Sequence, residues 1–273
     1  RGRIFGSIVC ALVFAISVGV PGAMVLGWMV PAWQQSAGVG VIETSRGLLA
    51  GIWRPMWNSL SVSLITAALA VIACVPFLVL AHRSQATRGQ SGAGRIGRLA
   101  LIGFGLPGVI VGFAFARLGW QLDGVIESLF LGEASPAFFF LYQSMSLLIA
   151  AYLVRCVTES LGPAMACLNR LPIERIDAAH GLGASRAHAW WKVGLPALWP
   201  GLLAGAGLSF LTVIKELPIT LIARPTGFDT LATELYTNLD NSFHAAAAPQ
   251  ALAMVILSMG VVAALVAWQK NAG

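Results

Sequence analysis

Residues 177–196 read DAAHGLGASRAHAWWKVGLP. This stretch lies between two apolar runs and mixes charged residues with small residues and with the turn-forming residues glycine and proline. Its small residues, from Ala178 to Ala184, would let the surface of a partner approach a short helix closely. Gly183 is expected to adopt the positive φ that ends this helix, because glycine has no Cβ to oppose that conformation. The stretch therefore predicts a connector in which one short helix ends and another begins.

The composition of the whole chain is that of a membrane protein. Hydrophobic residues make up 58% of the 273 residues, charged residues make up 10%, and the mean hydropathy is +0.80. Soluble domains carry about 25% charged residues. The formal net charge is +6, but the basic residues are not clustered with aromatic residues as nucleic-acid binding requires. We therefore expect the chain to lie in a membrane and to bind no nucleic acid.

Six apolar runs approach the roughly 20 residues that a helix needs to cross a bilayer. A segment in lipid must be helical, because lipid offers no hydrogen-bond partner to open backbone groups. The sequence therefore predicts an all-α membrane protein with six transmembrane helices, at about 5–30, 57–80, 99–118, 136–154, 197–214 and 250–268. The glycine pairs Gly108–Gly112 and Gly201–Gly205 have the small-xxx-small spacing that lets two helices pack closely.

The basic residues predict how the chain is oriented. If the N-terminus is cytoplasmic, 12 of the 17 lysines and arginines fall on the cytoplasmic side, Arg155 among them. Lysine and arginine are enriched in cytoplasmic loops. Both termini and the 177–196 stretch are therefore expected in the cytoplasm.

The 177–196 stretch resembles the EAA loop of ABC-importer permeases. That pattern is E-A-A, three residues, G, nine residues, I, one residue and L-P; here Asp177 replaces the glutamate and Val193 replaces the isoleucine. The resemblance implies the type I ABC-importer permease fold for residues 1–273 as a single transmembrane domain, with a cytoplasmic coupling loop at about 158–196. It also implies contact with a partner ATPase through Asp177, Ala178, Ala179, Gly183, Leu195 and Pro196. The alternative interpretation is an amphipathic connector between two spans.

A second informative stretch follows the fifth apolar run and reads KELPIT at 215–220. Lys215 and Glu216 would be costly in lipid unless they are paired or face water. Pro218 removes a backbone donor and interrupts the helix, which is tolerated only against protein or a wet cavity. We therefore expect Lys215, Glu216 and Pro218 to line a translocation path or gate, each charge with its own partner on an opposing permease half. The alternative is that Lys215 only extends to the outer membrane surface.

Residues 215–233, KELPITLIARPTGFDTLAT, are similar to the segment after the EAA loop in ferric-iron transport permeases, and LPG at 106–108 is similar to a string of the same family. The resemblance covers about residues 99–260 and is closer to the C-terminal half of those two-half permeases. It implies one half of a permease for ferric iron, which would explain a chain that begins at Arg1 rather than Met. Permeases for thiamine, sulfate, polyamines and phosphonate share the EAA loop and remain alternatives.

The resemblance also implies partners and a location. A dimer of ABC ATPases would bind ATP and Mg and hydrolyse the ATP, a second permease half would complete the path, and an external substrate-binding protein would deliver the substrate. The implied location is a bacterial inner (plasma) membrane, in contact with lipid. The chain itself is expected to bind no cofactor and to be no enzyme, since it has no GxxxxGK[ST] phosphate-binding loop.

Other residue patterns predict little chemistry. The four histidines are separated in the sequence, so they favour no metal site, and the metal-binding residues stay unknown. The four cysteines show no CxxC spacing and are expected to be small packing residues. Two other classes of function fit the residues: a secondary transporter or channel that needs no ATPase, with Lys215 and Glu216 as its ion site, and a structural membrane partner.

Overall fold

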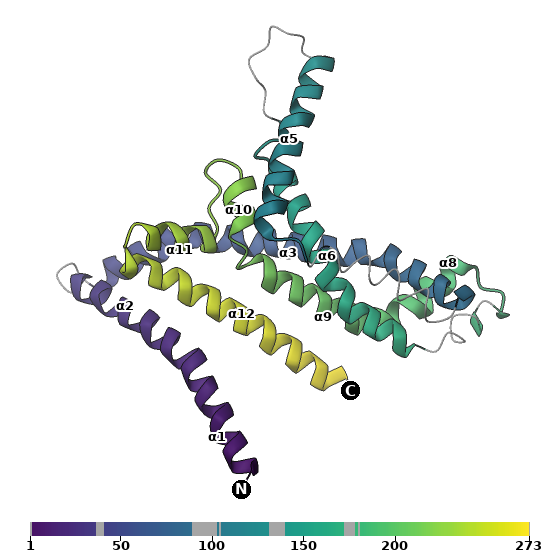
Figure 1. Cartoon of the computed structure of the whole chain (residues 1–273), viewed down its shortest axis with the longest axis horizontal. Coiled ribbons are helices and arrows are strands. Elements are labelled where there is room, and N and C mark those ends of the chain that lie inside the picture. The colour runs from purple at the N-terminus through teal and green to yellow at the C-terminus, as the bar shows by residue number, and fades with distance from the viewer. Residues whose placement is uncertain are drawn as a thin grey trace. The chain divides into compact units, whose positions relative to one another are not determined.

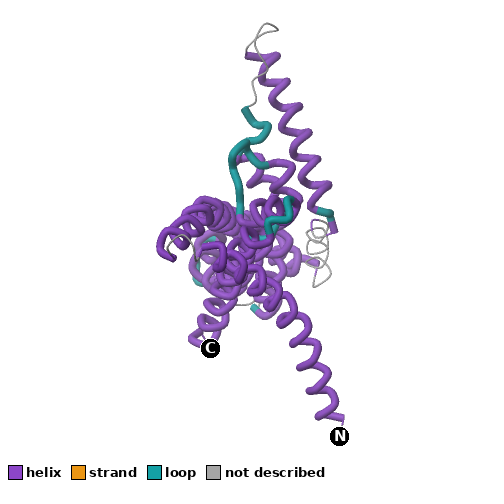
Figure 2. The backbone as a smooth tube through the Cα atoms, turned by 90° about the vertical axis from the view of Figure 1, so that its left-hand side faces the viewer, coloured by secondary structure: helices purple, strands orange, loops and turns teal. Residues whose placement is uncertain are grey.

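The structure is a computed structural model that describes residues 2–36, 41–88, 103, 105–130, 140–171, 178–179 and 181–272. The described residues form helices joined by turns and loops, with no strand among them, as Figure 2 shows. The expected all-α architecture is confirmed.

The helices follow one another along the chain as labelled in Figure 1. Their bounds are α1 Gly2–Phe14, the π-helical turn η1 Ala15–Gly19, α2 Val20–Ser36, α3 Val41–Arg88, α5 Gly108–Phe130, α6 Met145–Arg170, α8 Arg186–Ala189, the π-helical turn η3 Trp190–Gly194, α9 Leu195–Val213, α10 Pro218–Ala223, α11 Leu231–Asp240 and α12 His244–Ala272.

Six of these helical segments are long and apolar enough to cross a membrane, as the sequence predicted. They are Phe5–Met29, Gly51–Arg83, Gly108–Leu129, Met145–Arg170, Ala187–Val213 and His244–Trp268. The third and fourth spans begin later in the chain than expected. The third begins at Gly108, directly after Pro107, and the fourth at Met145, where the Ser144 side chain accepts a hydrogen bond from Leu147 N and so caps the helix. The fourth also continues to Arg170, because the charged residues in its middle have partners: Arg155 pairs with Glu216, and Glu159 accepts a hydrogen bond from Thr212.

The chain divides into two compact units. One comprises residues 1–57 and 229–257, and the other comprises residues 58–228 and 258–273. In the first unit, the Thr230 side chain caps α11 by accepting a hydrogen bond from Thr233 N at 3.3 Å. The rings of Trp28 and His244 stack there with their centroids 5.1 Å apart.

The second unit contains the two helices that pack most closely, α6 and α9, which run side by side in Figure 1. Glycine makes this packing possible. A Cβ on Gly201 would lie 2.7 Å from the carbonyl oxygen of Pro163, and a Cβ on Gly205 would overlap the backbone of Ser160. The same unit buries leucines of α3, α6 and α9 in one apolar cluster that includes Leu78, Leu161 and Leu202.

The short helix α10 packs on α5 in the same unit. A Cβ on Gly112 would lie 3.1 Å from the side chain of Ile222, so this glycine also permits a close approach. Both glycine pairs that the sequence marked for close packing therefore lie at helix contacts.

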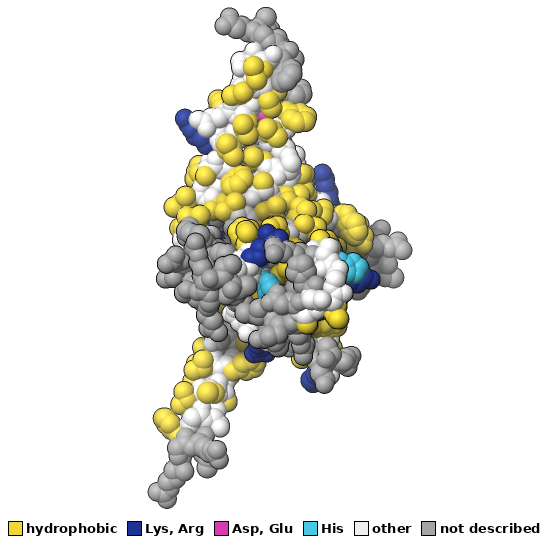
Figure 3. All heavy atoms as spheres, turned by 90° about the vertical axis from the view of Figure 1, so that its right-hand side faces the viewer, with side chains coloured by type: hydrophobic (Ala, Val, Ile, Leu, Met, Phe, Trp, Pro, Cys, Tyr) yellow, Lys and Arg dark blue, Asp and Glu magenta, His cyan; other side chains and the backbone are white. Residues whose placement is uncertain are grey.

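The surface of the described residues is largely apolar. Phe5, Leu129 and Val255 are more than half exposed, and Figure 3 shows hydrophobic side chains over most of the visible described face. Such a surface is stable against lipid rather than water. Among the cysteines, Cys74 and Cys156 are buried packing residues as expected, whereas Cys10 is exposed.

Candidate functional site

The helix that carries the fifth span ends in a turn that places a glutamate inside the protein. α9 ends at Val213 and α10 begins at Pro218; we call residues 214–217 between them the elbow. Glu216 N donates to Val213 O at 3.0 Å, which closes the turn. Pro218 occupies the first turn of α10, where its missing N–H leaves no helical hydrogen bond unmade. The interruption expected at Pro218 is therefore present.

Glu216 forms an ion pair with Arg155 of α6. Arg155 Nη1 donates to Glu216 Oε2 at 2.9 Å. The glutamate side chain is 7% exposed, and that of the arginine is 32% exposed. A buried charge is tolerated when it is paired. The arginine side chain is only partly buried, so part of it remains accessible at the protein surface.

This ion pair belongs to a row of polar contacts between one face of α6 and the segment α9–elbow–α10. Residues three or four apart on a helix lie on the same face, and every polar residue in this row faces a polar partner. We call this row the polar seam; its pairs are Tyr152–Thr220 at 2.5 Å, Arg155–Glu216 at 2.9 Å, Ser160–Ser209 at 2.6 Å, and Glu159–Thr212, in which the threonine hydroxyl donates to the carboxylate.

One oxygen of Glu216 stays unsatisfied. Within the described residues, Glu216 Oε1 is buried and has no hydrogen-bond partner. Burial raises the pKa of this carboxyl, while the charge of Arg155 and a backbone hydrogen bond from Ile219 lower it. The site therefore holds its charge at a cost in desolvation energy.

Glu216 also contacts the start of α5. A Cβ on Gly108 would lie 2.5 Å from Glu216 Oε1 and 3.1 Å from Arg155 Nη1. The LPG string at 106–108 and the KELP string at 215–218 are more than a hundred residues apart in sequence, yet they meet here. Only glycine at position 108 leaves room for this meeting.

Two expectations about this site are wrong in detail. Glu216 was expected to find its partner on an opposing permease half, but its partner is Arg155 of the same chain. Arg155 was counted as a cytoplasmic loop residue, whereas it lies within α6 (Met145–Arg170). The physical reason is the same in both cases, since a charged residue can lie within a membrane span when it pairs with an opposite charge. Lys215 is exposed, next to the buried Glu216.

Arg155 and Glu159 are the site residues that sequence reasoning missed. They follow Tyr152 at helical spacing, one to two turns along α6, which is the signal that marks a polar face. A span placed at 136–154 left both residues outside the helix and hid that signal.

Two of the predicted coupling residues, Ala178 and Ala179, lie in a helical turn that ends at Gly183. Asp177 lies outside the described residues, whereas Ala178 and Ala179 are helical. Leu182 N donates to Ala178 O at 3.1 Å and Ala184 N donates to Ala179 O at 3.2 Å, around Gly183 with φ +91°. This is the hydrogen-bonding pattern in which a left-handed residue ends a helix. The positive φ expected at Gly183 is confirmed, and the neighbouring Leu182 is 90% exposed.

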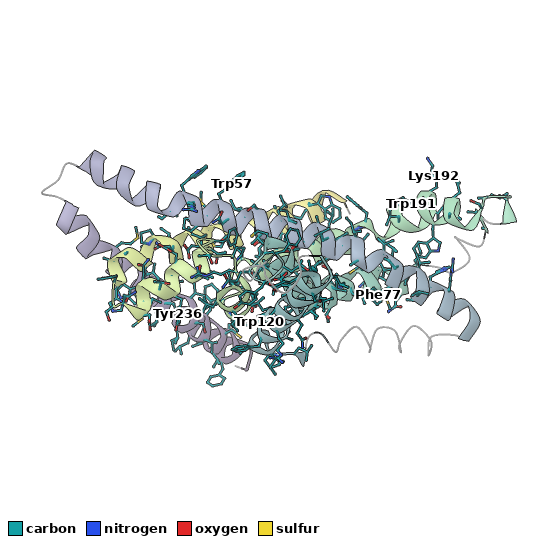
Figure 4. The ribbon with its side chains drawn as sticks, turned by 90° about the horizontal axis from the view of Figure 1, so that it is seen from above. Trp57, Phe77, Trp120, Trp191, Lys192 and Tyr236 are labelled. Carbon is teal, nitrogen blue, oxygen red and sulfur yellow. The ribbon has the colours of Figure 1, made fainter. Side chains whose placement is uncertain are left out.

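The chain then returns to the membrane segment through α8 and η3. Trp190 packs edge-on against His82 with ring centroids 5.3 Å apart, and Gly194 is buried beneath the Trp190 ring. Figure 4 shows Trp191 and Lys192 projecting outward from η3. Leu195 and Pro196 are the first two residues of α9, so they belong to the helix that follows the connector. The first part of the predicted 158–196 loop is helical, because α6 extends to Arg170.

No group of three or more His, Cys, Asp or Glu residues suited to a metal ion occurs within the described part of the chain. His82 lies against Trp190, and His244 lies against Trp28. His180 lies outside the described residues, and His188 is exposed.

Comparison with known proteins shows which proteins this chain is similar to. No family model matches the chain. The chain is 26% identical over 248 residues to the Fe(3+)-transport system permease protein FbpB 2 of Haemophilus influenzae, a match that covers 90% of this chain and 43% of that protein. It is 30% identical over 158 residues to the sulfate transport system permease protein CysT of Salmonella typhimurium, which covers 57% of this chain and 54% of that protein. It is 28% identical over 119 residues to the diacetylchitobiose uptake system permease protein DasC of Streptomyces coelicolor, which covers 43% of this chain and 41% of that protein.

The chain is a homologue of ABC-transporter permeases. Its fold agrees with that relationship, since it matches a chain of a bacterial alginate ABC transporter, solved in complex with an alginate-bound periplasmic protein, with a TM-score of 0.63 and 12% identity. That match covers 97% of this chain and 92% of the other. The permease homologue is thus a multi-pass, all-α membrane protein, with six candidate spans among its described residues. It spans about half the length of the curated relatives that it matches.

Proposed function

We propose that this chain is a transmembrane permease subunit of an ATP-driven importer, and that it passes ferric iron from an external binding protein to the cytoplasm. The observation that carries the proposal is the meeting of the LPG and KELP strings at Gly108 and Glu216. Both strings resemble those of ferric-iron permeases, and their contact gives them a shared physical role. One relative, an iron permease, also matches over 90% of this chain.

The chain would act by moving helices rather than by chemistry. Its polar seam lies between α6 and the α9–elbow–α10 segment, and Arg155, Glu159 and Thr212 are only half-buried. Polar groups at the level of apolar spans mark a path for a polar substrate when they face water. In the proposal, Lys215, Glu216 and Pro218 form the gate of this path, and a second permease half supplies its opposite wall.

Energy for transport would come from an ATPase dimer that binds ATP and Mg. The proposed docking surface comprises Asp177, Ala178, Ala179 and Gly183, with Leu195 and Pro196 at the start of the following span. Leu182, beside these small residues, is 90% exposed, so its side chain is accessible to a protein partner. In this arrangement the docking surface and both termini face the cytoplasm.

Sulfate is the second substrate candidate, favoured by the similarity to a sulfate permease. The test is uptake by vesicles that contain the purified transporter with its ATPase and binding protein. We expect radiolabelled ferric iron to be taken up and excess unlabelled sulfate not to compete. Uptake of sulfate without uptake of iron would reject the iron assignment and keep the importer.

A further inference from the structure

Arg155 pairs with one carboxylate and has a second one nearby on its own helix. It donates to Glu216 at 2.9 Å, and Glu159 lies four residues further along the same helix, α6. Side chains four residues apart on a helix are neighbours on its surface. Arg155 can therefore reach Glu159 by a change of side-chain rotamer, without any change in the backbone of α6.

Neither carboxylate forms a bidentate pair with Arg155. Glu216 uses only Oε2, and its Oε1 is buried without a hydrogen-bond partner. Glu159 accepts from Thr212 of α9. A buried carboxylate that is half satisfied is held less firmly than a bidentate one. The Arg155–Glu216 pair is therefore suited to being broken and remade.

The elbow and α10 are joined to α6 through side chains, which can exchange partners without a change in the backbone of α6. Tyr152 bonds Thr220 at 2.5 Å and so anchors α10 to α6, and the Thr220 hydroxyl donates in turn to the backbone carbonyl of Glu216 at 2.5 Å. α9 ends at Val213 and α10 begins at Pro218, so no continuous helix joins the two across the elbow. Gly108 of α5 lies next to Glu216 and has no side chain that could donate a hydrogen bond to the carboxylate.

We propose that Arg155 is the positioning residue of a two-position ion pair, held by Glu216 in the conformation described here and by Glu159 when the elbow separates from α6. Without Glu159, separation of the elbow would leave the arginine without a partner carboxylate inside the protein, which is costly. The proposal rests on the proposed function, because it needs a transporter that alternates between two conformations.

Charge inversion separates this switch from a fixed structural pair. In the double variant Arg155→Glu with Glu216→Arg, the elbow pair can form again, but Glu159 now faces a like charge. We expect the complete transporter to assemble with its ATPase and to lose at least about tenfold in ATP-dependent uptake, the scale of a conformational coupling. Adding Glu159→Arg restores both pairs and should restore uptake. Wild-type uptake by the double variant would overturn the switch, since a fixed pair needs only the first exchange.

A second measurement serves if the inverted charges prevent assembly. Glu159→Gln keeps the shape of α6 and removes the second carboxylate; Glu127→Gln, an acid of α5 outside the polar seam, is the matched control. A Lys215→Cys probe, in a chain whose four natural cysteines are replaced, reports the elbow by its rate of reaction with a membrane-impermeant thiol reagent. We expect labelling to differ between nucleotide-free and ATP-bound transporter in the control and to be the same in both states in Glu159→Gln.

The outcomes distinguish the two proposals. State-dependent labelling and wild-type uptake in Glu159→Gln would overturn the ion-pair switch alone. Absence of ATP-dependent uptake in the unmodified chain with its partners would instead reject the proposed function.

Discussion

Gly108 and Glu216 are in contact only because residue 108 has no side chain: a Cβ there would lie 2.5 Å from Glu216 Oε1. The start of α5 is thereby packed against the elbow between α9 and α10. The same Cβ would lie 3.1 Å from Arg155 Nη1, so residue 108 controls the space of the whole ion pair.

Replacement of Gly108 by alanine should therefore displace the ion pair. The added methyl group forces the buried Glu216 carboxylate to move, and overpacking of this kind costs about 1–3 kcal/mol. We expect a lower midpoint of thermal unfolding in detergent. Gly124→Ala is the matched control on the same helix, because nothing lies within 4 Å of the position of its Cβ. Equal midpoints for the two variants would show that the elbow does not depend on residue 108.

The stability of the protein should depend on pH through Glu216. Burial raises the pKa of this carboxyl above its ordinary value of 4.5, and Arg155 opposes that shift. A raised folded-state pKa contributes stability that is fully present below the unfolded pKa and is lost as pH rises through the folded pKa. Relative to Glu216→Gln, the unfolding midpoint of the unmodified chain should therefore fall as pH is raised from below 4.5 through the raised value. A midpoint difference that stays constant, or rises, with pH would contradict this.

Substitution at Gly183 should uncouple the chain from its ATPase. Gly183 has φ +91°, so any larger L-residue strains the helix end, and arginine also places a charged side chain beside the exposed Leu182. We expect Gly183→Arg to insert in the membrane normally while losing ATPase in co-purification, or hydrolysing ATP without uptake. Gly181→Arg tests the charge without a positive φ. Normal uptake by Gly183→Arg with the ATPase bound would leave this stretch a connector only.

The orientation of the chain can be tested with reporter fusions. The distribution of basic residues predicts that a reporter after Arg88 or Lys192 is cytoplasmic and that one near Glu133 or Asp229 is external. Arg155 lies within α6 rather than in a loop. Without it, the predicted cytoplasmic side still carries more lysines and arginines than the external side. A cytoplasmic signal from the Asp229 fusion would overturn the orientation.

The sequence was sufficient to predict the spans because lipid imposes one requirement on all of them, namely an apolar helix of sufficient length. The left-handed turn at Gly183 was predictable because its cause is local. The starts of the third and fourth spans were missed, since the apolar runs begin before Pro107 and before Ser144. The helices themselves begin only after these residues, and the Ser144 side chain caps the second of them.

The polar seam was beyond the reach of sequence reasoning for a different reason. Glu216 was marked by its charge and by Pro218, but its partner depends on how α6 packs against α9, which is a tertiary contact set by Gly201 and Gly205. The resemblance to known permeases marked the LPG and KELP strings separately. Nothing in the order of residues indicates that Gly108 and Glu216 touch.

ATP dependence of uptake tests the central claim most directly. Vesicles containing this chain with its second permease half, ATPase and binding protein should accumulate substrate only when ATP is supplied to the ATPase side, and a non-hydrolysable analogue should not support accumulation. Uptake at the same rate without ATP, or without the ATPase, would contradict the account and identify the chain as a secondary transporter or channel.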